Sequence, residues 1–433
     1  MGTGARSDYC CQYMFSNCIS LVNAPTLGAT TLAQYCYFHM FDGCTSLINA
    51  PVLPSNSIPD YAYSSMFEGC TSLVTSPTLN AYSINTYGYN RMFAFCTSLV
   101  NVQDILPSVN NGTYAYRCMF YGCTSLVKAP KLPRTLLYTG LYQYMFAGCT
   151  SLNYIDCMAI DMTATNSILE WTAAIQDKAV DNTQSGVAST GTFIQRAGAT
   201  WDSGVSGIPQ GWTVKYLNPE DGKYYNDSAC TSEWQDSPYP SNMTRISYLQ
   251  NNGNKARIWT GLFNFITKYE VKFNYTTWKS GAPVLDNYNG ANNNRIGIIM
   301  PSSNNGNLSI YFDTKSNGGA TTVAAAAGSD HTIIVDKAAS ITVDNTTTAI
   351  TNTTAGTANN NSIALFAANT TNSTLYATGM KIYYFKAWNN GLLIRHLIPV
   401  RISDSEGAMY DISNGQLLTN PYEDAFTLGP DIT

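Results

Sequence analysis

The feature that most constrains this chain is a repeat of about 26 residues in its first third. Met-Phe pairs recur with separations of 26, 26, 26, 27 and 26 residues, at Met14, Met40, Met66, Met92, Met119 and Met145. A cysteine follows each pair in phase, at Cys18, Cys44, Cys70, Cys96, Cys123 and Cys149. A unit this small cannot bury its own apolar face, so neighbouring units must stack around one continuous core. A period in this range with a recurring leucine, here three residues after each cysteine, indicates a solenoid of the leucine-rich kind.

The repeats resemble the BspA-type leucine-rich repeats of surface proteins from gut bacteria and protists. The resemblance is carried by an aromatic residue, a Gly-Cys turn, a leucine and a closing proline: Phe41, Gly43, Cys44, Leu47 and Pro51. It covers roughly residues 5–155. It implies a parallel sheet on one side, irregular or short helical segments on the other, and a role in adhesion or ligand binding.

The sequence predicts that the solenoid ends near residue 155 and is closed by a cap over residues 156–216. The stretch "SILEWTAAIQ" (Ser167 to Gln176) has apolar residues at roughly helical spacing and predicts a short capping helix. The glycine-rich stretch that follows supplies further apolar residues for the cap: Phe193, Trp201, Ile208 and Trp212. No equivalent cap precedes Tyr9, which suggests truncation or docking at that end.

The cysteines are predicted to pack as reduced thiols in the core. There are 12, an even number that by itself suggests disulfides. However, six share one phase of the repeat and so form a column, in which a buried thiol behaves as a small hydrophobic group. Occasional disulfides between neighbouring coils stay an alternative. No Cys-x₂-Cys pair of the kind that binds zinc is present.

Pairs of tyrosines flank a small residue in four consecutive repeats and are the candidate ligand-binding residues. They are Tyr35, Tyr37, Tyr61, Tyr63, Tyr87, Tyr89, Tyr114 and Tyr116. If the residue between them points inward on an extended chain, both neighbours point partly outward and form two ladders. Tyrosine is favoured on recognition surfaces. The alternative is that the stacked rings only cover the core.

The second half of the chain predicts a β-sandwich over residues 243–433, after a polar linker over residues 217–242. Short runs bounded by Asn, Gly and Ser read as strands: "YEVKFNYTTW", "RIGIIMP", "NLSIYFDT", "HTIIVDK", "SITVDN", "NSIALFAAN" and "GMKIYYFKAW". Many short strands separated by turns are typical of a sandwich. The fold class predicted for the whole chain is therefore mostly β, with a leucine-rich-repeat solenoid followed by an antiparallel jelly-roll sandwich.

This half resembles the laminin-G-like, concanavalin-type jelly-roll domains. The resemblance is carried by the strands around His331 and Ser340, by the stretch from Lys381 to Arg401 and by the ending from Gly407 to Ile432. It implies a module that binds glycans or proteins. Some relatives bind Ca²⁺, for which the possible ligands are Asp286, Asp313 and Asp344; no compact acidic loop contains them.

We expect no enzymatic activity. Glycoside hydrolases need two carboxylates about 5–9.5 Å apart, and the one alternating acidic pair, Asp404 and Glu406, lies in the loop-like "SDSEG". The three histidines, His39, His331 and His396, belong to no catalytic motif. No metal or cofactor is expected.

Composition favours an extracellular recognition protein. Charged residues make up only 12% of the chain and the net charge is −5, without the basic cluster of a nucleic-acid binder. No run of 18 apolar residues predicts a membrane span. The expected partner is a surface glycan or protein of a bacterial cell, with a homo-oligomer or other virion proteins as further partners. The N-terminus lacks a secretory signal, so the alternative is a structural virion component, such as a phage capsid, tail fibre or decoration protein.

Overall fold

The structure is a computed structural model of the 433-residue chain, which divides into two compact units. The first unit comprises Met1–Asn218 and Tyr224–Trp234, and the second comprises Pro219–Lys223 and Gln235–Thr433. The residues that the structure describes are 7–81, 83–107, 112–175, 185–235, 243–252, 258–260, 262, 266–277, 282–286, 295–300, 307–314, 321–336, 340–349, 363–366, 378–420 and 425–432.

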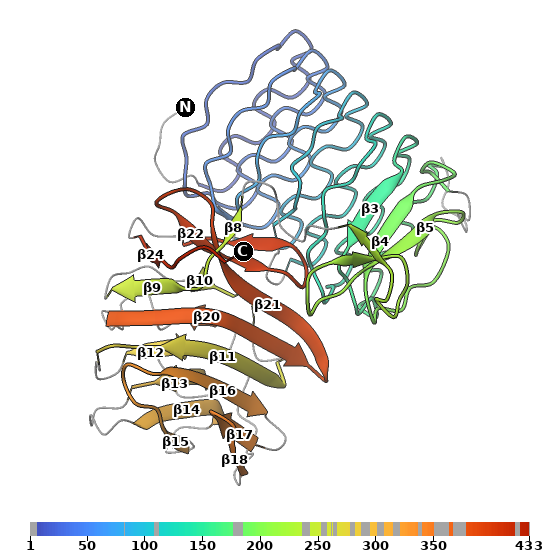
Figure 1. Cartoon of the computed structure of the whole chain (residues 1–433). Coiled ribbons are helices and arrows are strands. Elements are labelled where there is room, and N and C mark those ends of the chain that lie inside the picture. Colours follow the sequence, from blue (N-terminus) through green and yellow to red (C-terminus); the bar gives the residue numbers. More distant parts are fainter. Residues whose placement is uncertain are drawn as a thin grey trace. The chain divides into compact units, whose positions relative to one another are not determined.

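The chain is mostly β, as predicted, and its described residues contain no helix. The strands of the first unit are β1 (Ser57–Ile58), β2 (Ser83–Ile84), β3 (Tyr154–Cys157), β4 (Thr192–Arg196), β5 (Thr213–Leu217), β6 (Tyr224–Tyr225) and β7 (Glu233–Gln235). Few of these lie in the repeats, whose coils are drawn in Figure 1 as a stack of loops. The parallel sheet expected along the repeats is reduced to β1–β2 and to single bridges such as Asn49↔Thr75.

Backbone hydrogen bonds between coils hold the repeats together. Along one side of each coil, alternate residues donate their N–H groups to carbonyls of the next coil, as Tyr37 donates to Ala62 at 3.1 Å. The residues between them donate three residues back within their own coil, as Phe38 donates to Tyr35 at 3.2 Å. Each coil is therefore a string of linked turns whose buried backbone groups find partners without a helix or a continuous strand.

This pattern depends on a left-handed backbone at every fourth residue. In the third coil, Tyr61, Ser65 and Gly69 have φ of 57°, 54° and 71°. Residues with a Cβ are sterically disfavoured in the left-handed region of φ, whereas glycine is not. A Cβ added to Gly43, at the position equivalent to Gly69, would lie 2.4 Å from Asn17 Oδ1. Glycine is therefore favoured at Gly43 by both conformation and space, although Asn17 and Phe95 adopt the same left-handed φ at the equivalent positions of other coils, at 58° and 60°.

The helix predicted over residues 167–176 is absent from the residues described there, which continue the string of turns. Asn166 and Glu170 have φ of 56° and 48°, and Phe146 donates its N–H to the Trp171 carbonyl at 2.8 Å. The segment thus adds one more coil of the same kind beyond residue 155. The apolar spacing that suggested a helix arises because turns with a left-handed residue every four positions have a similar period. Gln176 lies outside the described residues.

The core of the solenoid is a set of columns, one residue from each coil. Phenylalanines stack in near-parallel pairs, with 5.6 Å between the ring centroids of Phe41 and Phe67. The cysteine thiols donate to the phenylalanine carbonyls of the preceding coil, at 3.2 Å from Cys70 to Phe41. Equivalent bonds of 3.0 Å are made by Cys44, Cys96, Cys123 and Cys149.

These five cysteines are free and buried, as predicted for the column. Burial raises the pKa of Cys44 to about 11 and that of Cys149 to about 12, since the thiolate loses its hydration. The prediction that all six are buried is wrong for Cys18, which is exposed in the first coil. The described residues place no earlier coil against Cys18.

Beyond the repeats, the first unit ends in a sheet with the order β3-β4-β5-β6-β7, parallel from β3 to β5. Phe193 of β4 and Trp212 join the same apolar core as the repeats, and the Trp171 indole donates to Gly207 O at 2.8 Å. A buried Lys131 Nζ lies 3.4 Å from Asp156 Oδ2. Burial raises the pKa of Asp156, and the charge of Lys131 opposes this shift.

The second unit consists of two antiparallel sheets. One has the order β10-β19-β12-β13-β14-β15 and the other contains β18-β17-β16-β11-β20-β21-β22-β23 with β8, β9 and β24 alongside. Their bounds are β8 (Thr244–Arg245), β9 (Leu249–Asn252), β10 (Ile258–Trp259), β11 (Lys268–Asn274), β12 (Pro283–Asp286), β13 (Arg295–Ile299), β14 (Asn307–Thr314), β15 (Thr321–Ala324), β16 (Asp330–Asp336), β17 (Ser340–Val343), β18 (Thr346–Ala349), β19 (Ala364–Leu365), β20 (Thr378–Asn389), β21 (Leu392–Arg401), β22 (Gly407–Asp411), β23 (Gln416–Leu418) and β24 (Thr427–Leu428).

The described interior of this unit is mostly apolar but contains a buried ion pair between Arg395 and Asp411. Tyr269, Val271 and Phe273 of β11 are buried and alternate with half-buried residues, as their period-two pattern predicts. Arg395 Nη1 lies 3.2 Å from Asp411 Oδ2, and Arg395 Nε donates across to the Thr260 carbonyl at 3.1 Å, which links the two sheets.

Asp411 also organises the turn between β22 and β23. Its Oδ1 accepts hydrogen bonds from the N–H and the hydroxyl of Ser413, at 3.0 and 2.6 Å, and from the His396 N–H at 2.9 Å. The fully buried carboxylate therefore has polar partners on both of its oxygens.

The cysteine column predicts a graded pattern of thiol reactivity. We expect Cys10 and Cys18 to react with maleimide in the native protein, because both are exposed. The five buried column cysteines should react only after unfolding, because their raised pKa leaves little thiolate near neutral pH. Peptide mapping after timed labelling measures this, and rapid native labelling of Cys70 or Cys96 would contradict the coil register.

Burial of His396 predicts a loss of stability in mild acid. Burial lowers the pKa of His396 to about 4 from 6.5, so between these pH values the unfolded chain binds a proton that the folded chain does not. The free energy of unfolding should therefore fall as pH drops through this window, by up to about 3 kcal/mol. His396→Gln should flatten this part of the urea-midpoint profile. An unchanged slope in His396→Gln would refute the assignment.

Candidate interaction surface

The structure separates the eight candidate tyrosines into an outer and an inner column. The outer column contains Tyr35, Tyr61, Tyr87 and Tyr114, which are half-buried. The inner column contains Tyr37, Tyr63, Tyr89 and Tyr116, which are fully buried. The residue between them is buried as predicted, at Cys36, Ala62, Gly88 and Ala115, whereas Cys10 is exposed.

The expectation that both tyrosines of each pair point partly outward is wrong for the inner column. It assumed an extended chain, on which neighbours of an inward residue point outward. Instead, Tyr35 and Tyr61 have left-handed φ of 56° and 57°, and the turn that follows directs Tyr37 and Tyr63 into the core. Burial raises the pKa of Tyr63 and Tyr89. These rings pack against one another and are not available to a ligand in the folded protein.

The outer tyrosines form a continuous ring stack. Tyr9 begins it, and the centroids of successive rings are separated by 4.8, 4.5, 4.7 and 4.8 Å. Because each ring covers the face of the next, ring edges and hydroxyl groups are what this column presents to solvent. Burial raises the pKa of Tyr61 and Tyr87, with the neighbouring tyrosines adding to the shift. The stack covers the core and leaves little apolar area for a partner.

A different column carries the exposed apolar surface of the repeats. We define the aliphatic stripe as the residues that follow the core leucine in five successive coils: Val22, Ile48, Val74, Val100 and Val127. Their exposed fractions lie between 41% and 49%, high for aliphatic side chains at equivalent positions in five neighbouring coils. Backbone bonds fix their register, including Ile48 N–H to Val22 O and Val100 N–H to Val74 O, both at 3.0 Å.

A ladder of mostly neutral polar side chains runs beside the stripe. We define this polar ladder as Asn23, Asn49, Thr75, Asn101 and Lys128, which are all exposed. Asn49 Nδ2 donates to Asn23 Oδ1 at 3.0 Å, and Asn101 Nδ2 lies 3.3 Å from Thr75 Oγ1. The side chains therefore continue the contacts that the backbone bridges begin between coils.

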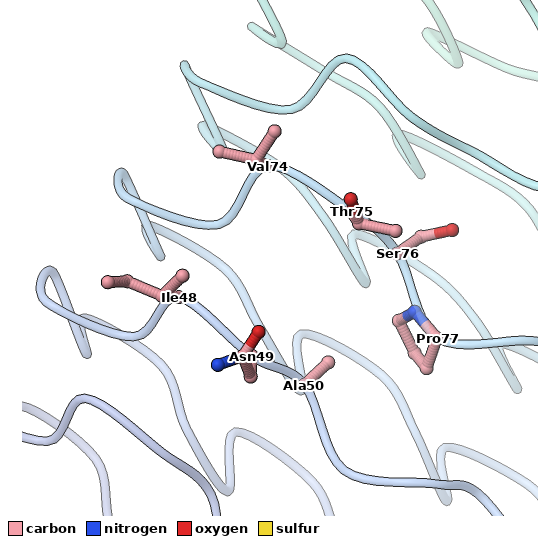
Figure 2. Close-up of a pocket in the computed structure, with 7 residues that line it drawn as sticks. All are labelled: Ile48, Asn49, Ala50, Val74, Thr75, Ser76 and Pro77. Carbon is pink, nitrogen blue, oxygen red and sulfur yellow. The ribbon is translucent and has the colours of Figure 1, made fainter.

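Stripe and ladder meet in a shallow groove between the second and third coils. Figure 2 shows its seven lining residues, three on one coil and four on the next: Ile48, Asn49, Ala50, Val74, Thr75, Ser76 and Pro77. None of them is charged, and Lys128 is the one charged residue among segments 22–25, 48–51, 74–77, 100–103 and 127–130. This surface can offer apolar contact and neutral hydrogen bonds, with little electrostatic attraction.

The candidate calcium ligands do not converge among the described residues. Asp286 is buried in β12, while the Asp344 carboxylate accepts from the Thr332 N–H at 2.8 Å and lies 2.6 Å from His331 Nδ1. The side chain of Asp313 lies outside the described part of the chain. No group of three or more His, Cys, Asp or Glu residues within the described ranges is arranged to hold a metal ion.

The remaining titratable candidates also lie apart. His39 Nδ1 is 2.8 Å from Asp42 Oδ2 in the second coil, and His396 is buried in β21. Asp404 and Glu406 are exposed in the loop between β21 and β22. Among the residues described, no helix is long and apolar enough to span a membrane.

Comparison with known proteins returns one solved structure. The chain is similar to a protein described as "T. pallidum Leucine Rich Repeat protein", with 26% identity over 34% of this chain and 62% of that one, and a TM-score of 0.24. The description of the repeats depends on their own contacts. No protein-family model and no curated protein matches.

The contrast between the two tyrosine columns predicts very different costs of truncation. Tyr63→Ala should lower the free energy of unfolding by about 3–5 kcal/mol, because it leaves a cavity inside the column. Tyr61→Ala removes one ring from a half-exposed stack and should cost about 1 kcal/mol. Urea denaturation followed by circular dichroism compares the two variants directly, and equal losses would contradict the separation into inner and outer columns.

Proposed function

We propose that this chain is a non-enzymatic recognition protein that attaches to a protein surface through the aliphatic stripe and the polar ladder. The observation that carries the proposal is the repetition of a half-exposed aliphatic residue in five successive coils. Soluble proteins rarely leave contiguous apolar surface open to water, and such patches mark interaction sites. Stacked repeats extend this surface along the solenoid, as solenoid proteins do for their partners.

The chemistry of the surface indicates how such a partner is bound. Aliphatic side chains supply apolar burial at the centre, and amides and a hydroxyl alongside supply neutral hydrogen bonds, in the manner of an apolar core with a polar rim. Because only Lys128 is charged, affinity should vary little with salt. Each contact is weak, so several displayed copies would strengthen attachment through avidity.

The second unit serves, in this proposal, as an additional binding module. Its two-sheet architecture supports the laminin-G-like resemblance inferred from the sequence, but fold alone does not specify function. A glycan partner for this unit, and an extracellular site for the whole chain, are parts of the proposal supported by that resemblance and by the low content of charged residues. The acidic pair Asp404 and Glu406 lies on an exposed loop, in keeping with a non-enzymatic role.

Charged substitutions on the stripe should abolish attachment. Beads coated with the full chain are incubated with intact gut bacterial cells, and bound cells are counted by flow cytometry. Val74→Asp with Val100→Asp should lower retention by about tenfold or more, because each carboxylate must lose its hydration in the interface. Val52→Asp is the matched control, because Val52 is a valine outside the stripe with 79% exposure.

Equal retention by the stripe variant and the control would refute the role of the stripe. A glycan array probed with the same full-length proteins tests the finer prediction. Glycan binding that survives the stripe substitutions would assign glycan recognition to another part of the chain. Circular dichroism of each variant confirms that a loss of retention is not a loss of folding.

A further inference from the structure

The geometry points to a second copy of this chain as the protein that occupies the aliphatic stripe, packed with its stack of coils antiparallel to the first. This inference depends on the proposed function, because it names the partner of the same surface. It makes the attachment homotypic: copies displayed on different surfaces hold each other through identical faces.

The distance between neighbouring coils along the stripe carries the argument. We call each coil's stripe residue, with the ladder residue that follows it, a rung. Beside the stripe, the residues of the polar ladder form parallel bridges between neighbouring coils, at Asn23↔Asn49, Asn49↔Thr75 and Thr75↔Asn101. Chains bridged in this way lie about 4.7–4.9 Å apart. A helix laid along the stripe repeats about every 5.4 Å per turn, and a strand presents same-face side chains about every 6.6–6.8 Å. Over five rungs the helix drifts by about 2 Å and the strand by more. A second copy has the same repeat and stays in register at every rung.

The chemistry of the surface is also self-complementary. Consider a two-fold axis that passes through Val74, lies in the plane of the interface and is perpendicular to the direction in which the coils stack. Rotation about it places stripe against stripe and polar ladder against polar ladder. Amides and hydroxyls both donate and accept, so the ladders of two copies can pair. A two-fold contact of this kind closes on itself.

The position of Lys128 selects the antiparallel arrangement. A parallel pair would bring the two Lys128 side chains together at one end of the interface. In the antiparallel pair each Lys128 lies opposite Asn23 of the other copy, and the two charges are about 19 Å apart, more than the Debye length of about 8 Å.

The pairing assigns a partner to each rung. Val74 lies on the two-fold axis and faces itself, Ile48 faces Val100, and Val22 faces Val127. Specific interfaces bury about 800 Å² per partner, and five half-exposed aliphatic side chains with one ladder lie at the small end of that range. We therefore expect association in the micromolar range or weaker, strengthened when many copies are displayed.

Cysteine crosslinking of the full chain tests the register. In a background with Cys10→Ser and Cys18→Ser, which removes the two exposed thiols, Val74→Cys should form a dimer with a short bis-maleimide. Val22→Cys alone should not, because its partner is Val127, whereas a mixture of Ile48→Cys and Val100→Cys proteins should crosslink. Sedimentation equilibrium should show reversible dimers of the unmodified chain at high micromolar concentration, and Val74→Asp with Val100→Asp should abolish them while Val52→Asp does not.

Two results would overturn the inference. One is a chain that stays monomeric throughout and gives no Val74→Cys crosslink. If that monomer still retains cells in a stripe-dependent way, the homotypic partner is wrong while the proposed function stands. The other is strong crosslinking of Val22→Cys to itself, which would replace the antiparallel pair with a parallel one.

Discussion

The structure of the repeats depends on hydrogen bonds between neighbouring coils. Along the side of each coil that is built of turns, half of the N–H groups donate to carbonyls of the next coil. The other half donate three residues back and close turns within the coil. Neither set suffices alone, because an isolated coil would leave the first set without a partner in the protein. The left-handed residues that this geometry requires, such as Tyr61 and Ser65, are unfavourable individually. They are tolerated because the stack fixes them from both sides, and this dependence makes the solenoid cooperative.

The cysteine column follows from the same constraint. The Phe41 carbonyl accepts the Cys44 N–H of its own coil at 3.1 Å and the Cys70 thiol of the next coil at 3.2 Å. A thiol is apolar enough for a fully buried position and still donates weakly to the remaining lone pair. The six cysteines occupy the same position of the repeat, and equivalent positions of a stacked repeat are buried to the same extent. This was sufficient to predict burial for five of them. The exposure of Cys18 follows from its coil, which has only one described neighbour.

Period and alternation predicted the parts of the fold that depend on burial alone. They located the repeats, the mostly β second half and the buried face of β11. They failed where the backbone conformation decides in which direction a side chain points. The segment after Ser167 forms turns and Tyr63 points inward, because a pattern of apolar residues does not reveal a left-handed residue at every fourth position. The short strand β12 ("PVLD") was missed because four residues carry too little periodicity.

The aliphatic stripe was missed for a related reason. In a single repeat, Leu73 and Val74 read together as core, because both are aliphatic and adjacent. In the stack, Leu73 points into the core, whereas Val74 and the polar Thr75 that follows it are both left in water. The signal was present as a second aliphatic column in phase with the first. Its recurrence in five coils distinguishes the stripe from a single exposed valine such as Val52 and supports the contact role proposed for it. An uncharged surface of this kind gains affinity from matched spacing and loses it with any partner whose repeat differs, so geometry supplies the selectivity that charge does not.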